Sequence, residues 1–285
     1  MRNEAGAEGS AARTSGHLRI GALVNEEAPI GHVKLRRYLD RGKDLAVTVG
    51  TFTSFFRAYQ EHVHRWELDS DGLTLALMRE GLAAAALHMV TRPLDETFGV
   101  TVNIHTPPLN LFLAGDAWEA TLTGRAFVEG VRTSESGRFF VQSRRRRSEP
   151  VQSAIDVEGL DVLGMFEDYY RRSEQNPARF FDLDRDRFLQ VLALPGGSKS
   201  LIEGMEREEA RSLVRPGAEL LGERSVQFSC GCNLEKILVA LHGMFDDPEE
   251  LFQGDDRVEV NCPRCGARWT VTRDAFEKAA PADDD

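Results

Sequence analysis

The sequence has few cysteines and no long apolar run. Only four of its 285 residues are cysteine, and they form two tight pairs near the C-terminal end. The longest nearly apolar stretch, GLAAAALHMV at residues 81–90, is too short to span a bilayer. The N-terminal segment MRNEAGAEGSAARTSG lacks the apolar region of a signal peptide. We therefore expect a cytoplasmic protein with no membrane partner, whose thiols stay reduced.

Common catalytic motifs are also missing. No G-x-S-x-G, P-loop or G-x-G-x-x-G sequence occurs. His62 and His64, in the sequence HVH, are a candidate metal or base pair. Because no cysteine or carboxylate motif accompanies them, surface or packing histidines are the preferred interpretation. We therefore expect no enzyme, no catalytic residues and no organic cofactor.

Positive charge is scarce as well. The formal net charge is −11, and residues 226–285 hold 13 acidic against 6 basic residues. A module with this excess of negative charge is expected to repel the phosphate backbone of nucleic acid, so nucleic acid is not an expected partner. The run Arg144–Arg147 is the exception, and it is either a nucleic-acid patch or a solvated loop between two strands. The loop is preferred because no aromatic residue is interleaved with the arginines.

Hydrophobic periodicity predicts an α+β fold. Residues 74–90 have strong helical propensity, and a second helix is expected over 160–175, before Pro177. Between them, short apolar segments separated by turn residues predict an antiparallel meander, beginning with the alternating Phe98, Val100, Val102 and Ile104. We expect an antiparallel-sheet core with packed helices, a helical linker and a small C-terminal four-cysteine zinc module.

The composition divides the chain into five expected segments. These are a disordered tail (1–17), a core domain (18–197), a metastable linker (198–227), a zinc-binding redox-switch domain (228–280) and an acidic tail (281–285). The linker is rich in Glu and Arg and is interrupted by Pro216 and several glycines. Val214, Leu220 and Leu221 are among its few large apolar anchors. It is either an ordinary solvent-facing helix pair or a segment that is folded but weakly held.

The two cysteine pairs predict a zinc site. Cys230 and Cys232 form C-x-C, and Cys262 and Cys265 form C-x-x-C after a further 29 residues. Two thiol pairs separated by a helix-sized insertion are typical of a tetrahedral four-thiolate site, so we expect one Zn²⁺ per chain in the reduced state. The alternative, four buried apolar thiols, requires the chain's only cysteines to form two pairs by coincidence.

The segment between and after these pairs predicts a compact module. Asn233 is expected to cap a helix whose apolar face carries Leu234, Ile237, Leu238, Leu241, Met244 and Phe245. Asp247 and Pro248 are typical of the start of another short helix. RVEVNC and ARWTVT are expected to form two strands that flank the second cysteine pair.

Neighbouring thiols allow redox chemistry as well as structural metal binding. Structural zinc contributes roughly 10–16 kcal/mol to the folding of small modules, about as much as a whole domain's stability. A Cys232–Cys262 disulfide would close a loop of about 30 residues and replace roughly 3–4 kcal/mol of that contribution. Disulfides within each pair would restrain almost nothing. Oxidation within the pairs would therefore make the site an unfolding switch, whereas cross-linking would hold the module together.

Several motifs together resemble one family. They are CGCNLEKILVALHGM, VEVNCPRCGARWTV, YYRRSEQNPARF (169–180) and FLQVLALPGG (188–197). From about residue 95 to 280 the chain resembles the redox-regulated chaperones of the thirty-three-kilodalton heat-shock protein family.

The resemblance implies a switching mechanism. Oxidation would form the Cys230–Cys232 and Cys262–Cys265 disulfides, release zinc and unfold the zinc module and the linker. The oxidised protein would form a homodimer and hold unfolding client proteins without ATP under stress.

The alternative is a binding module for protein or RNA whose zinc is purely structural. Zinc release by peroxide or hypochlorous acid distinguishes the two functions.

Overall fold

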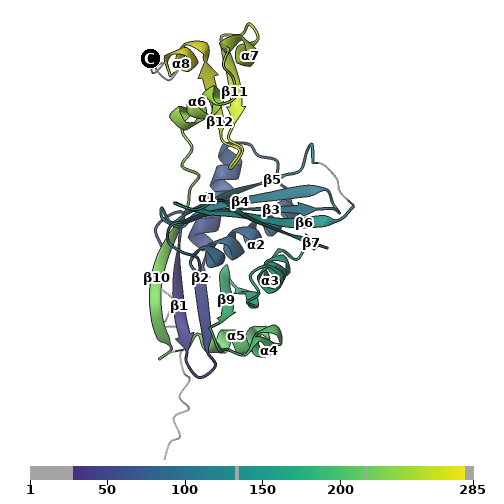
Figure 1. Ribbon diagram of the computed structural model, residues 1–285, viewed down its shortest axis with the longest axis vertical. Coiled ribbons are helices and arrows are strands. Elements are labelled where there is room, and N and C mark those ends of the chain that lie inside the picture. Colours follow the sequence, from purple (N-terminus) through teal and green to yellow (C-terminus); the bar gives the residue numbers. More distant parts are fainter. Residues whose placement is uncertain (1–27, 132–134, 216, 280–285) are drawn as a thin grey trace, which may run out of the picture.

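The computed structural model describes residues 28–131, 135–215 and 217–279 (Figure 1). The expected tails at 1–17 and 281–285 lie outside the described residues. The elements run in the order β1 (His32–Asp40), β2 (Leu45–Thr51), α1 (Thr53–Arg65), α2 (Gly72–Met89), β3 (Glu96–Ile104), β4 (Leu109–Asp116), β5 (Thr121–Phe127), β6 (Gly137–Arg145), β7 (Val151–Val157), α3 (Val162–Arg172), β8 (Ala178–Asp184), β9 (Arg187–Ala193), α4 (Lys199–Glu203), α5 (Arg207–Leu213), β10 (Glu219–Phe228), α6 (Leu234–His242), α7 (Pro248–Phe252), β11 (Arg257–Asn261), β12 (Arg268–Thr272) and α8 (Arg273–Lys278). This confirms the α+β class.

One large sheet carries the core. Its strand order is β7-β6-β3-β4-β5-β10-β1-β2-β9-β8, and β11 and β12 form a separate hairpin. Strands β3 to β7 pair antiparallel, as the predicted meander requires. The link between β5 and β10 is parallel and only two residue pairs long. The sheet therefore has two arms joined through β10, and Figure 1 shows them running in different directions.

The helices fill the space beside these arms. In β3 the predicted alternation is confirmed, because Phe98, Val100, Val102 and Ile104 are all buried. Helix α2 begins at a capping box in which the Asp71 carboxylate accepts from Thr74 N at 2.7 Å. Its alanine run, 83–86, is fully buried, so both sheet arms and α3 pack closely against this helix.

The segment 198–227 differs from the expected helical linker. Helices α4 and α5 and the turn between them pack on the outer face of β8 and β9 through four buried side chains, namely Ile202, Met205, Ala210 and Leu213. The remainder is strand β10, which pairs with β1 over eight residue pairs. Leu220 and Leu221, which we expected to be anchors, are 52% and 48% exposed. Strand pairing with β1, rather than side-chain burial, holds this half of the segment.

The last elements form a small module with its own apolar cluster. Asn233 and Asp247 cap α6 and α7 as predicted, and β11 and β12 flank the second cysteine pair. The first of these helices is shorter than expected and ends at His242, so Met244 is 72% exposed instead of lying on the buried face. Figure 1 shows this module projecting beyond the large sheet.

No helix within the described residues is long and apolar enough to cross a membrane.

Candidate metal centre

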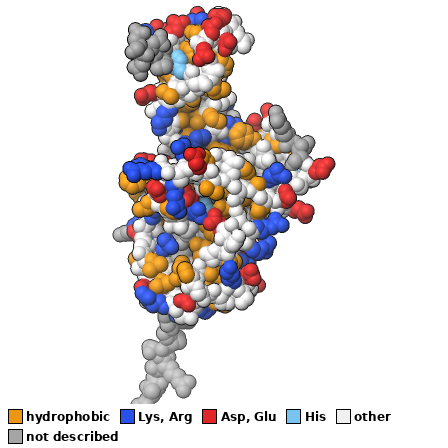
Figure 2. Space-filling view, viewed as in Figure 1, with side chains coloured by type: hydrophobic (Ala, Val, Ile, Leu, Met, Phe, Trp, Pro, Cys, Tyr) orange, Lys and Arg blue, Asp and Glu red, His pale blue; other side chains and the backbone are white. Residues whose placement is uncertain are grey.

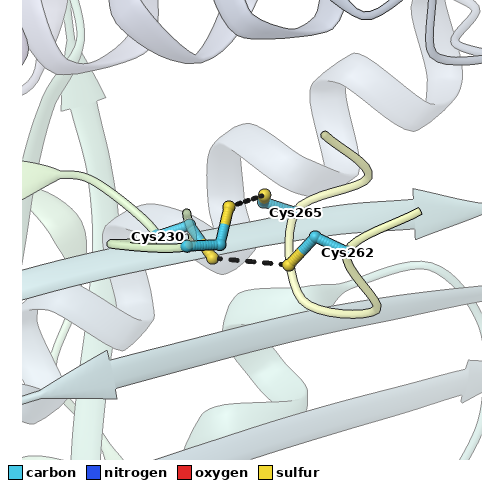
Figure 3. Close-up of side chains that lie close together, drawn as sticks. Cys230, Cys262 and Cys265 are labelled. Atoms are coloured by element: carbon cyan, nitrogen blue, oxygen red, sulfur yellow. Dashed lines mark hydrogen bonds between the residues drawn. The ribbon is translucent and has the colours of Figure 1, made fainter. Parts of the chain in front are cut away.

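The four cysteines come from two chain segments that meet at the base of the C-terminal module. Cys230 and Cys232 directly follow β10, which ends at Phe228. Cys262 and Cys265 lie in the loop between β11 and β12. Figure 3 shows Cys230 facing the loop that carries Cys262 and Cys265, with the sulfur atoms directed toward one another. The first cysteine pair is thus attached to the core sheet without an intervening spacer.

Local backbone geometry explains why each loop points its thiols inward. Gly231 and Gly266 adopt φ values of +64° and +78°, a region that residues with a Cβ rarely occupy. In the second loop, Gly266 N donates to Cys262 O, and Cys262 N donates to Ala267 O, both at 2.8 Å. These two bonds close a tight turn around the thiols.

The sulfur positions fit a tetrahedral metal. The Sγ atoms of Cys230 and Cys262 are 3.7 Å apart, and those of Cys232 and Cys265 are 3.6 Å apart. All four sulfurs lie within 4.8 Å of one another. Zinc–sulfur bonds of 2.3 Å in a regular tetrahedron require sulfur separations of about 3.8 Å. The structure therefore brings the four predicted residues together in the arrangement that Zn²⁺ needs, while zinc binding itself stays a prediction.

Mutual hydrogen bonding gives three of the thiols, those of Cys230, Cys262 and Cys265, different pKa values in the absence of a metal. Hydrogen bonds from the thiols of Cys230 and Cys265, together with backbone N–H groups, lower the pKa of Cys262. The Cys230 thiol donates to Cys262, which raises the pKa of Cys230 to about 12. The Cys262 sulfur therefore ionises readily, whereas hydrogen bonding and burial raise the pKa of Cys230 and of Cys265. Ionisation of one thiol thus disfavours ionisation of its neighbours. A bound divalent cation would favour the thiolate form of all four cysteines together.

Sequence reasoning missed a residue of the core that reaches this site. His62 Nε2 donates to the Cys265 carbonyl oxygen at 2.8 Å, across 203 positions of sequence. Its ring also packs edge-on against Phe228, with 5.6 Å between centroids. Burial lowers the pKa of His62, so its ring favours the neutral form. The HVH motif was visible, but no sequence signal linked it to a cysteine so far along the chain.

Further contacts join the core to the module at the same place. Arg268 Nη2 donates to Trp66 O at 3.0 Å, and its Nη1 lies 3.5 Å from the Glu67 carboxylate. A pocket of about 400 Å³ lies beside these contacts, and the first cysteine pair and Cys265 form part of its wall. Small molecules can therefore approach the half-buried first cysteine pair from one side, whereas Cys262 and Cys265 are buried.

Figure 2 shows hydrophobic side chains where the narrow module meets the core.

The other sequence candidates lie apart from the cysteines. His64 is exposed and lines a different pocket from that of the cysteines. Arg144 and Arg145 end β6, and the run continues into the turn before β7, as the solvated-loop interpretation predicted. The structure adds an aromatic residue that the linear sequence did not show, because the Arg146 guanidinium lies 4.5 Å from the ring centroid of the exposed Trp118.

Comparison with known proteins gives a consistent result. Residues 190–272 match the family model described as Hsp33 protein. The chain is 33% identical to a 33 kDa chaperonin of Brevibacillus brevis over 85 residues, which is 30% of this chain and only 29% of that relative. It is 24% identical to a 33 kDa chaperonin of an Enterobacter species over 245 residues, covering 71% of this chain and 83% of the relative.

A solved structure shares the fold. The crystal structure of the 33 kDa chaperonin (heat shock protein 33 homolog) of Thermotoga maritima matches with a TM-score of 0.65 at 16% identity. The match covers 87% of this chain and 97% of that one.

Proposed function

We propose that the chain belongs to the Hsp33 family and that it is an oxidation-activated, ATP-independent holdase chaperone of the cytoplasm. In the reduced state, Cys230, Cys232, Cys262 and Cys265 hold one Zn²⁺ and the protein is inactive. Oxidation would remove two electrons from each pair of zinc-bound thiolates and pass them to a peroxide or hypochlorous acid, which takes up protons from water as it is reduced, and would leave two local disulfides. Disulfide sulfurs are poor zinc ligands, so the four cysteines would no longer hold the ion.

One observation carries this proposal: the first cysteine pair is continuous with β10. Phe228 ends the strand and Cys230 follows two residues later. Unfolding of the module therefore removes the C-terminal anchor of β10. Of the strand's ten residues only Val226 is buried, and Phe228 at its end packs against Phe55 and Tyr59 of α1. Little side-chain packing therefore holds the first seven residues of the strand in place.

The rest of the segment 198–227 is weakly held as well. The ion pairs of β10, Arg36–Glu223 at 2.7 Å and Arg41–Glu219 at 2.6 Å, lie on the surface, where salt screens them. Helices α4 and α5 and the turn between them contribute four buried side chains, of which the three large ones, Ile202, Met205 and Leu213, are each worth about 1.5–3 kcal/mol at most. Ordering each residue costs about 1–2 kcal/mol in backbone entropy. The segment therefore depends on its neighbours to stay folded.

Melting of this segment would produce a surface suited to unfolding proteins. Leu220 and Leu221 stand beside Glu219 and Glu223 in the same strand, so apolar groups for client contact are flanked by charge that keeps the complex soluble. The partners are unfolding client proteins and, in the oxidised state, a second copy of the chain. The activity is binding rather than catalysis.

A light-scattering assay tests this function. A heat-unfolded client enzyme is incubated with the reduced, zinc-loaded protein, with the oxidised protein, and with protein reduced again in the presence of zinc. Only the oxidised form is expected to suppress aggregation at near-stoichiometric ratios. A variant with serine at all four cysteine positions should show the same scattering before and after oxidant. If the reduced and the oxidised protein suppressed client aggregation equally, oxidation would not control the activity and the redox switch would be contradicted.

A binding module with purely structural zinc is the second candidate. The Arg146–Trp118 stack favours it, because exposed aromatic and guanidinium groups together bind single-stranded nucleic acid. Retention of zinc under peroxide or hypochlorous acid would support this candidate over the holdase.

A further inference from the structure

His62 contacts both chain segments that carry the cysteines. Its Nε2–H donates to the Cys265 carbonyl oxygen, and its ring packs against Phe228, two residues before Cys230. The residue lies in the last turn of α1, a helix of the core rather than of the C-terminal module. It therefore joins the first cysteine pair, the second cysteine pair and the core at one point.

The Cys265 carbonyl oxygen, which accepts the hydrogen bond from His62, is not used by the hydrogen bonds that close the cysteine loop. The closing bonds of the turn use Cys262 N, Cys262 O, Gly266 N and Ala267 O. The Cys265 carbonyl is left to face α1, and His62 supplies its partner. A buried carbonyl without a partner is costly, so this loop position is stabilised when the module lies against the core.

Three neighbouring residues extend the contact. Trp66 packs against the module's apolar cluster and accepts a hydrogen bond from Arg268 through its carbonyl, and Glu67 forms an ion pair with the same arginine. Leu68 lies so close to Gly266 that an added Cβ there would be 2.7 Å from Leu68 Cδ2. We call His62, Trp66, Glu67 and Leu68 the α1 docking surface.

We propose that the α1 docking surface holds the second cysteine loop in place and that His62 is the residue that positions Cys265 for metal binding. The rate at which zinc leaves the reduced protein is then set by the core as well as by the module. This deepens the proposed function, since it rests on zinc at the four cysteines, but it requires neither client binding nor disulfide formation.

The physical reason is the order of events during metal loss. A thiolate must separate from the cation before a chelator can replace it. Movement of Cys265 breaks the His62 bond and pulls Gly266 away from Leu68, so the docking surface opposes the first step. Movement of the first pair is opposed in the same way by the packing of Phe228 on His62.

Transfer of zinc from the reduced full-length chain to a chromogenic chelator tests this proposal. His62→Ala is expected to release zinc about tenfold faster than the unchanged chain, the factor that corresponds to one lost hydrogen bond. His62→Gln retains an N–H donor and should recover much of the difference. His64→Ala, the matched control two residues away on the same helix, should release zinc at the unchanged rate.

A second variant keeps the test decisive if His62→Ala misfolds. Arg268→Ala removes the contact with Trp66 and Glu67 from the module's side and should also accelerate release. Equal rates for His62→Ala, Arg268→Ala and His64→Ala would overturn the proposal, as would a failure of His62→Gln to slow release relative to His62→Ala. Such results would leave oxidation-dependent holding of clients untouched. A reduced chain that contained no zinc would instead contradict the proposed function itself.

Discussion

A Cys265→Ser variant is expected to bind well under half an equivalent of zinc and to have an unfolded C-terminal module. Cys265 is fully buried, and its sulfur lies 3.6 Å from that of Cys232. A serine hydroxyl is a far weaker zinc ligand than a thiolate. Structural zinc contributes roughly 10–16 kcal/mol to modules of this size, so its loss exceeds what the module's small apolar cluster can offset.

Metal analysis and limited proteolysis of the purified variant measure both effects. The unchanged chain should contain one zinc per chain and resist cleavage between α6 and β12. Ser229→Ala is the matched control, because Ser229 adjoins Cys230 and lines the same pocket but supplies no thiolate. It should retain a full equivalent of metal. A Cys265→Ser protein with one tightly bound zinc and a protected module would contradict the four-thiolate site.

Oxidation is expected to yield Cys230–Cys232 and Cys262–Cys265 rather than links between the two pairs. The folded site does not impose this choice, since the sulfurs of Cys230 and Cys262 are 3.7 Å apart and a tetrahedron brings all its corners equally close. Oxidation of the first thiolate would weaken the metal site, and each oxidised sulfur would find its partner as the module then opens. Two thiols of one pair, with only one or two residues between them, then meet at a much higher effective concentration than thiols separated by about 30 residues.

The disulfide pairing decides how much stability the oxidised module retains. A Cys232–Cys262 link would restore roughly 3–4 kcal/mol to the module, whereas local disulfides restore almost none. Digestion of the oxidised protein with a glutamate-specific protease, followed by mass spectrometry, should find each disulfide within a single peptide. Cross-linked peptides that contain mainly Cys232 and Cys262 would show that oxidation holds the module together, and the switch would then have to be abandoned.

Local patterns in the sequence sufficed to predict much of the fold. The alternation that starts at Phe98 predicted β3, and the caps at Asn233 and Asp247 predicted where α6 and α7 begin. The cysteine pairs could be assigned to one site because the chain holds no other thiols. Each of these signals lies within a few residues of the structure that it specifies.

Features that depend on distant partners were not predictable in this way. Strand β10 has almost no buried side chains, and its partner in the sheet, β1, lies nearly 200 positions earlier. Its sequence therefore carries no alternation to reveal a strand. The bond from His62 to Cys265 likewise joins residues that only the tertiary fold brings together. Met244 was misplaced because α6 ends one turn earlier than its apolar pattern suggested.

The central claim is that metal loss at the cysteines unfolds the segment immediately before them. Hydrogen exchange of the reduced, zinc-loaded protein and of the oxidised protein measures this coupling at each amide. On oxidation, α4, α5 and β10 should lose protection, while α2 and strands β3 to β6 should keep it. If α4, α5 and β10 stay equally protected after zinc has left, the coupling is absent and the zinc module is purely structural.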